Sequence, residues 1–372
     1  MKNKNDDFNK NFLTIAGGAG SGKTTLSNFI INNLNLYFQN KDIEETLVKM
    51  YVVATTRGQR DGETEGLDYN FALSEEDFRK LSKEDKLVHI LDIGVEIEVD
   101  GKKSPWLYGY TSFEGKSNEL TIIAIIESSV SAYIMEDMFR KNGNLDNAMT
   151  VNIVLDESDR EISMISRSLK NIEEILKNKD LVIKDFYPDG KPDIEFITKK
   201  FTDVEPKWFL GVLEDVKDRI DREKTKILDN ISTSREQNPK TYELLLDVPT
   251  LTIFSLKVKE TELHNYLFLN TLRVLKEALV EETFNDFYST VPSKVIDSFS
   301  GFIKREEENI QNDLSVFNID TNSCCDKDIE VKVSEDSNAI EILCKSLEQL
   351  KEFSNYINMN KSISQGVKLK NN

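Results

Sequence analysis

Blocks of apolar and polar positions alternate along the first half of the chain. Short apolar, β-branched runs, typical of strands that are covered on both faces, span residues 12–16, 46–54, 121–126 and 151–155. Apolar side chains recur at helical spacing over residues 23–37, 130–140 and 161–177. Strands that alternate with helices predict an α/β fold, in which a parallel sheet is flanked by helices. Residues 182–197 show a strand–turn–strand pattern instead.

The second half of the chain has a different pattern. Beyond about residue 221 long helical repeats dominate, for example over residues 263–278 and 340–357, and they carry no recognisable chemical motif. We therefore expect a flexible leader at 1–11, an α/β domain at 12–221, a mostly α-helical domain at 222–360 and a flexible tail at 361–372. The helices are expected to pack as a domain of their own, with oligomerisation or docking of a protein partner as the functional alternative.

The charge and residue composition of the chain limit the kinds of molecule that it is expected to bind. The chain of 372 residues has 48 Lys+Arg against 66 Asp+Glu, a net charge of −18. Nucleic-acid binding depends on clustered Lys and Arg, so this balance argues against nucleic acid while leaving room for a local basic pocket. Three cysteines and two histidines offer little material for a disulfide framework or a His-centred metal site. No apolar run could span a bilayer and no signal peptide is evident, so we expect no membrane partner and a cytoplasmic location.

A glycine-rich loop follows the first predicted strand. Gly17-Gly18-Ala19-Gly20-Ser21-Gly22-Lys23-Thr24 fits the G-x-x-x-x-G-K-[ST] pattern, and Thr25 continues into the predicted helix. Glycines let backbone N–H groups face phosphate oxygens, and the helix adds the positive end of its dipole. These residues are predicted to hold ATP, with Lys23 at the β- and γ-phosphates and the Thr24 hydroxyl on Mg²⁺. A chance glycine turn or a degraded loop is the alternative, which the presence of both Lys23 and Thr24 disfavours.

A second group of cations follows the next predicted strand. The segment Thr55-Thr56-Arg57-Gly58-Gln59-Arg60-Asp61-Gly62-Glu63 is followed by Gly66-Leu67-Asp68-Tyr69-Asn70-Phe71. The planar fork of an arginine matches phosphate oxygens, so Arg57 and Arg60 could bind a second phosphate. Taken by themselves, the two arginines are better explained as part of a solvated loop.

The order of these residues resembles that of the guanylate kinase family. The pattern TTRxxRxGExxGxDYxF stands behind a phosphate loop at the separation that the family shows. The resemblance covers about the first 220 residues, and it implies a P-loop kinase fold with a small acceptor-binding subdomain at about 57–115. It further implies that Arg57, Arg60 and Tyr69 bind the phosphate of an acceptor nucleoside monophosphate, and that ATP is the phosphoryl donor.

Further resemblances are looser. Tyr108 and Thr111 lie in a segment similar to the family's N-x-Y-G-T-S, with one extra residue, and Glu127 ends a strand that resembles the one beside the base. Arg160 and Arg167 resemble arginines of the lid, here at about 156–168, which the resemblance implies neutralise the transferring phosphoryl group. Surface salt bridging is the alternative for each arginine.

The base pocket departs from the family pattern. Val53 stands where the family usually has a serine that contacts the guanine carbonyl. The acid that reads the base edge could be Glu96, Glu98 or Asp92, with Glu96 preferred. Because a missing polar group weakens discrimination between bases, this departure puts guanine specificity in doubt but not phosphoryl transfer.

Three functions follow from these motifs. The first is an ATP-dependent nucleoside monophosphate kinase that phosphorylates GMP or dGMP. The second is a kinase of the same family that acts on a different or modified nucleotide acceptor. The third is a guanylate-kinase-like module that binds a protein partner through its acceptor cleft, which the intact Lys23 and Thr24 disfavour.

Overall fold

The fold was analysed in a computed structural model. It describes residues 7–41, 43, 47–59, 63–67, 69–71, 74–84, 86–99, 102–111, 118–125, 134, 137–138, 140–141, 146–155, 157–168, 193–200, 207, 209–221, 248–256, 258–316 and 337–370.

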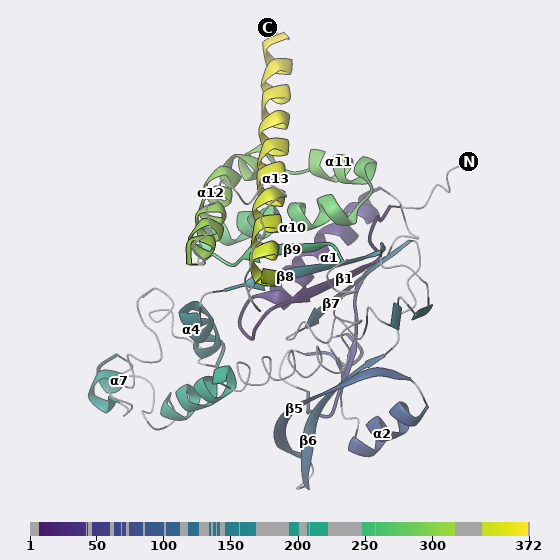
Figure 1. The fold of residues 1–372 in the computed structure, drawn as a ribbon, viewed down its shortest axis with the longest axis vertical. Coiled ribbons are helices and arrows are strands. Elements are labelled where there is room, and N and C mark those ends of the chain that lie inside the picture. The colour runs from purple at the N-terminus through teal and green to yellow at the C-terminus, as the bar shows by residue number, and fades with distance from the viewer. Residues whose placement is uncertain are drawn as a thin grey trace.

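A parallel sheet forms the centre of the molecule (Figure 1). Its strands are β1 (Phe12–Ala16), β2 (Leu47–Met50), β7 (Glu119–Ile125), β8 (Ala148–Val154) and β9 (Thr250–Phe254). The order is β2-β7-β1-β8-β9, and every neighbouring pair is parallel. All of β1 is buried, as expected for an apolar strand that lies in the middle of a covered sheet. The predicted α/β fold with a parallel sheet flanked by helices is therefore confirmed.

The last strand of this sheet comes from the second half of the chain. β9 pairs with β8 from Thr150↔Thr250 to Val154↔Phe254. Its side chains share one hydrophobic core with α1 (Lys23–Asn40) and α10 (Glu260–Ala278). The structure thus differs from the division predicted at residue 221, because a strand beyond that point completes the sheet and the core is continuous.

A second, smaller sheet has the order β4-β3-β6-β5. Its strands are β3 (Val53–Thr55), β4 (Tyr69–Asn70), β5 (Leu87–Val99) and β6 (Lys102–Thr111). The apolar run predicted as one strand at 46–54 is split, because β2 joins the main sheet and β3 joins this one. Helix α2 (Glu75–Lys83) packs on the sheet, with Phe78 against Gly109, and it starts with a capping box between Ser74 and Asp77.

Three helical segments contribute to a buried cluster that reaches the glycine loop. They are α4 (Glu157–Ser168), α7 (Ile194–Lys200) and residues 209–221. Ala19 of the loop shares a buried cluster with Ile162 of α4 and Phe209. The strand–turn–strand pattern predicted at 182–197 is wrong for residues 194–197, which are helical, and residues 182–192 lie outside the described residues.

The remaining helices gather at the end of the molecule opposite the β5–β6 hairpin (Figure 1). They are α10, α11 (Glu281–Ser289), α12 (Ser293–Val316) and α13 (Ser337–Lys370), whose C-terminal end projects beyond the body. Residues 361–370, predicted as part of a flexible tail, are helical. Of the predicted leader, Phe8 is buried and the Asn9 and Lys10 amides donate to Ala278 O. None of the described helices is long and apolar enough to cross a membrane.

Candidate functional site

The glycine loop joins the buried end of β1 to the start of α1. Gly20 and Gly22 have positive φ angles of 79° and 87°, which residues with a Cβ rarely adopt. Gly22 is also the N-cap of α1, and no side chain caps the helix there. The first-turn amides of α1 and the positive end of its dipole are thus available to an anion at the loop.

The first two glycines of the loop have close neighbours. A Cβ on Gly17 would lie 2.7 Å from Ser21 Oγ and 2.8 Å from Ile153 O of β8. A Cβ on Gly18 would lie 2.5 Å from the guanidinium carbon of Arg160. At Gly17 the loop therefore lies directly against the backbone of β8, with no space for a Cβ, and at Gly18 it lies against the movable end of the Arg160 side chain of α4.

The polar side chains of the loop divide into an inner and an outer set. Lys23 is buried and its Nζ donates to Gly18 O at 2.7 Å, so its ammonium group lies over the loop. Ser21 Oγ is buried and has no hydrogen-bond partner among the described residues. Thr24 and Thr25 are exposed in the first turn of α1. The inner groups favour an anion, and the outer hydroxyls are accessible to a metal ion that accompanies it.

Arg160 brings α4 onto the loop. Its Nε donates to Ala19 O at 3.2 Å, and its guanidinium lies beside Gly18. Of the two arginines predicted for the lid, Arg160 thus lies at the glycine loop. Arg167 belongs to the last turn of α4, and its side chain lies outside the described residues.

A second cationic cluster is centred on Arg57, directly after β3. Its guanidinium is 4% exposed and forms a two-bond fork with Glu63, with Nη1–Oε2 and Nη2–Oε1 distances of 2.7 Å. The guanidinium carbon lies 4.6 Å from the ring centre of Tyr69 and 5.1 Å from that of Phe71. Tyr108 lies beside Tyr69, with 5.8 Å between the ring centres. The structure therefore brings Tyr69 and Tyr108 to the buried, positively charged side chain of Arg57.

The electrostatics keep this cluster in one protonation state. Burial opposes the charge of Arg57, but the hydrogen bonds to Glu63 and the nearby Tyr108 outweigh burial and raise its pKa. Burial, followed by Tyr108, raises the pKa of the Tyr69 hydroxyl. Near neutral pH the cluster thus presents a cation and a protonated phenol, and both groups can donate to an oxyanion.

A shared core connects the elements that carry the two clusters. Phe12 and Ala16 of β1 belong to the same buried cluster as Tyr51, Val53 and Tyr108 around the second sheet. Tyr51 also contacts the second sheet directly, since its hydroxyl donates to Thr111 O of β6 at 2.6 Å. The positions of the two clusters are therefore coupled through side-chain packing.

The other residues predicted for the acceptor site have different surroundings. Thr111 is exposed and bonded to Tyr51, and Val53 is buried. Glu96 of β5 has a side chain that is 67% exposed and lies 3.4 Å from Lys103 Nζ, and Asp92 is exposed. The described contacts do not bring Glu96 to the Arg57 cluster. Arg60 and Glu127 lie outside the described residues.

The sequence motif does not by itself indicate a role for Glu63. Glu63 is the main partner of Arg57, although only its place in the motif could be seen in the sequence. An acid within a few residues of a predicted anion-binding arginine was the available signal.

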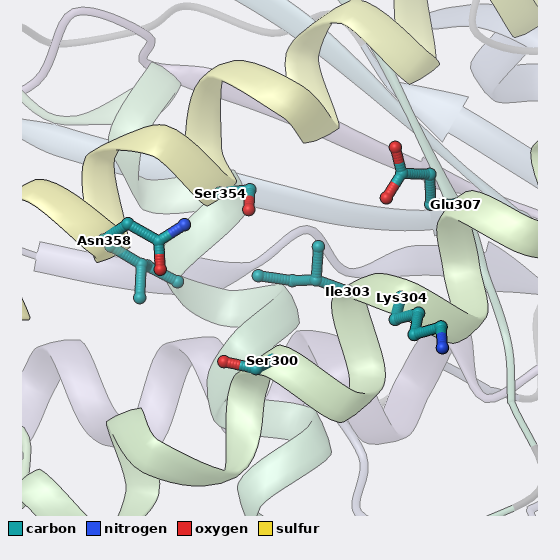
Figure 2. Close-up of a pocket in the computed structure, with 7 residues that line it drawn as sticks. Ser300, Ile303, Lys304, Glu307, Ser354 and Asn358 are labelled. Atoms are coloured by element: carbon teal, nitrogen blue, oxygen red, sulfur yellow. The ribbon is translucent and has the colours of Figure 1, made fainter.

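A separate pocket of about 200 Å³ lies between α12 and α13 (Figure 2). It is lined by Ser300, Ile303, Lys304, Glu307, Ser354, Ile357 and Asn358. None of these residues belongs to the glycine loop or to the Arg57 cluster, so the pocket contributes nothing to the candidate site.

The fold and the site together define an α/β chain, with a parallel five-stranded sheet flanked by helices and a glycine loop between its first strand and first helix. No protein-family model matches the sequence, and no curated protein matches it. Among solved structures, a guanylate kinase from Anaplasma phagocytophilum is similar at 20% identity with a TM-score of 0.26. The match covers 41% of this chain and 63% of that one, less than two thirds of its length. At this TM-score the likeness carries no argument about function.

Proposed function

We propose that the chain is an ATP-dependent nucleoside monophosphate kinase whose acceptor is GMP or dGMP. The observation that carries the proposal is the presence of two buried cationic clusters on a shared core. One is the glycine loop with Lys23, and the other is Arg57 with Tyr69 and Tyr108. Phosphoryl transfer needs mainly the alignment of two phosphates and the neutralisation of their charge, which is what paired cationic sites provide.

The donor half is argued from the glycine loop. The start of α1 and Lys23 would hold the β- and γ-phosphates of ATP, and Ser21 Oγ would gain a partner that it lacks among the described residues. The exposed Thr24 hydroxyl would ligate Mg²⁺. When bound, this ion would help to neutralise the negative charge of the ATP phosphates.

The acceptor half is argued from the Arg57 cluster. Arg57, Tyr69 and Tyr108 would hold the acceptor phosphate in line with the donor, together with Arg60. Arg160, which already lies on the loop, would neutralise the transferring group and help to exclude water, as Arg167 would from the same helix. Exclusion of water favours transfer to the acceptor over hydrolysis of ATP.

A second acceptor class is supported by one observation. Val53 is 5% exposed and apolar, in the position that would face the base in this proposal. An apolar group there cannot hydrogen-bond a guanine carbonyl, which favours a modified base or a different one. Thr111, Glu96 and Glu127 would complete the base and sugar side of either acceptor.

The test is an assay of ADP release from ATP with Mg²⁺, run with each ribo- and deoxyribonucleoside monophosphate. We expect the highest kcat/KM with GMP or dGMP; activity with another acceptor and none with GMP would favour the second class. Lys23→Ala should abolish transfer while leaving the melting temperature unchanged within a few degrees. ATP binding without transfer to any acceptor would reject the kinase and favour a partner-binding module.

A further inference from the structure

The guanidinium of Arg57 is only partly satisfied by its described contacts. An arginine has five N–H donors in one plane. Nη1 donates to Gly58 O and to Glu63 Oε2, and Nη2 donates to Glu63 Oε1. These bonds occupy the end of the group. The side chain also hydrogen-bonds to Tyr108 and to Tyr69. Nε is buried and has no hydrogen-bond partner among the described residues.

The unpaired donor has a definite geometry. Nε–H projects from the side edge of the guanidinium, away from the end that Glu63 holds, and a phosphate oxygen can accept from it there. Tyr69 and Phe71 stack against the group, so a ligand approaches in the plane of the guanidinium. A buried donor without a partner is unfavourable, and an oxyanion at this edge would remove that penalty.

We propose that Glu63 is a positioning residue that holds the end of the Arg57 fork and thereby presents its side edge to the acceptor oxyanion. The assignment of this oxyanion to a nucleoside monophosphate rests on the proposed function. Glu63 stays in place when the acceptor binds. In the free protein its carboxylate compensates a cation that is 4% exposed, which would otherwise be buried alone.

An opposite role would fit the same contact. Glu63 could occupy the place of the acceptor phosphate as an internal competitor and leave when the acceptor binds. The two roles predict effects of opposite sign. Loss of a positioning carboxylate weakens acceptor binding, because Arg57 is no longer held in orientation. Loss of a competitor strengthens acceptor binding, because the fork becomes free.

The experiment compares Glu63→Gln, Glu63→Ala and Glu63→Asp in the full-length protein with its best acceptor. For a positioning residue, the KM of the acceptor rises at least about tenfold in the Gln and Ala variants, while the KM of ATP stays within about twofold. The Asp variant recovers part of the loss. Glu76→Gln, at an exposed position of α2, is the matched control for the loss of one negative charge. An unchanged or lower acceptor KM in Glu63→Gln overturns the proposal.

A binding measurement separates this inference from the proposed function. Trp106 lies 6.2 Å from Tyr108 between ring centres, so its fluorescence in a Trp208→Phe background reports on the cluster. Inorganic phosphate and GMP are titrated without ATP. If the wild type transfers phosphate to no acceptor, the proposed function fails. The affinity for inorganic phosphate then tests the role of Glu63 by itself. At least about tenfold weaker binding in Glu63→Gln supports positioning. Equal or tighter binding, or no phosphate binding by the wild type, overturns it.

Discussion

A buried ion pair connects the C-terminal helices to the central sheet, and its removal gives a sharp prediction for stability. Arg273 of α10 and Glu306 of α12 are 1% and 0% exposed and are bonded to each other. Arg273 also donates to Thr252 O of β9 at 3.1 Å. Glu306→Leu would leave a buried guanidinium with only neutral partners. Breaking such a pair from one side costs roughly 3–5 kcal/mol of the free energy of unfolding.

The double variant Arg273→Met/Glu306→Leu gives the decisive comparison. It removes both charges and restores apolar packing, so its free energy of unfolding should lie within about 2 kcal/mol of that of the wild type, mainly for the lost bond to Thr252 O. The double variant should therefore be more stable than Glu306→Leu alone. A surface control is Glu308→Gln, whose carboxylate is 60% exposed and 3.8 Å from Lys304 Nζ; its effect should stay within about 0.5 kcal/mol.

The assay is equilibrium unfolding in urea, followed by circular dichroism at pH 8 on the full chain. Burial raises the pKa of Glu306 to about 7, so the carboxylate is mostly ionised at this pH. The reasoning is refuted if Glu306→Leu costs less than about 1 kcal/mol, or if the double variant is no more stable than the single one.

Two further predictions concern pH and the glycine loop. The pKa of Glu306 is about 7 in the folded chain against an ordinary 4.5, so the folded state binds more protons between these values. This group's contribution to stability therefore falls as pH rises from about 4.5 to 7, and the urea midpoint of the double variant should lack that component. Gly17→Ala should cost roughly 1–3 kcal/mol of unfolding free energy because its Cβ meets Ile153 O. Gly18→Ala should cost less because the Arg160 side chain can move, and thermal unfolding of both variants checks the order.

The sequence predicts best those elements that are determined by patterns over a few neighbouring residues. The first strand is predicted and found at Phe12–Ala16, and the helix predicted from Lys23 begins there. Both limits come from an apolar run and from glycine spacing within a few residues. The same kind of local signal stands at Thr250–Phe254, whose sequence TLTIF resembles the FLTIA of β1.

The partners of charged residues were not predictable in the same way. Arg57 belongs to a visible motif, yet its partner Glu63 is fixed only when the loop after β3 folds back. For Glu306 a signal existed in the helical pattern. It occupies the buried stripe that Phe299, Phe302, Ile303 and Ile310 define on α12, where an acid requires a buried partner. Periodicity marks such a position, but only packing shows which helix supplies the cation.

The continuity of the core changes how the C-terminal half can be tested. A chain that ends at Arg219 would lose β9, whose Leu251 and Ile253 are each 2% exposed in the shared core, and would leave β8 as an unprotected edge strand. We expect this truncated chain to show no cooperative unfolding transition and no ATP binding. A change in its oligomeric state would therefore indicate misfolding and not the loss of a dimer contact. Calorimetry with and without ATP checks this expectation. A truncated chain that unfolds cooperatively and binds ATP as the full chain does would show that the helices are dispensable for the phosphate loop.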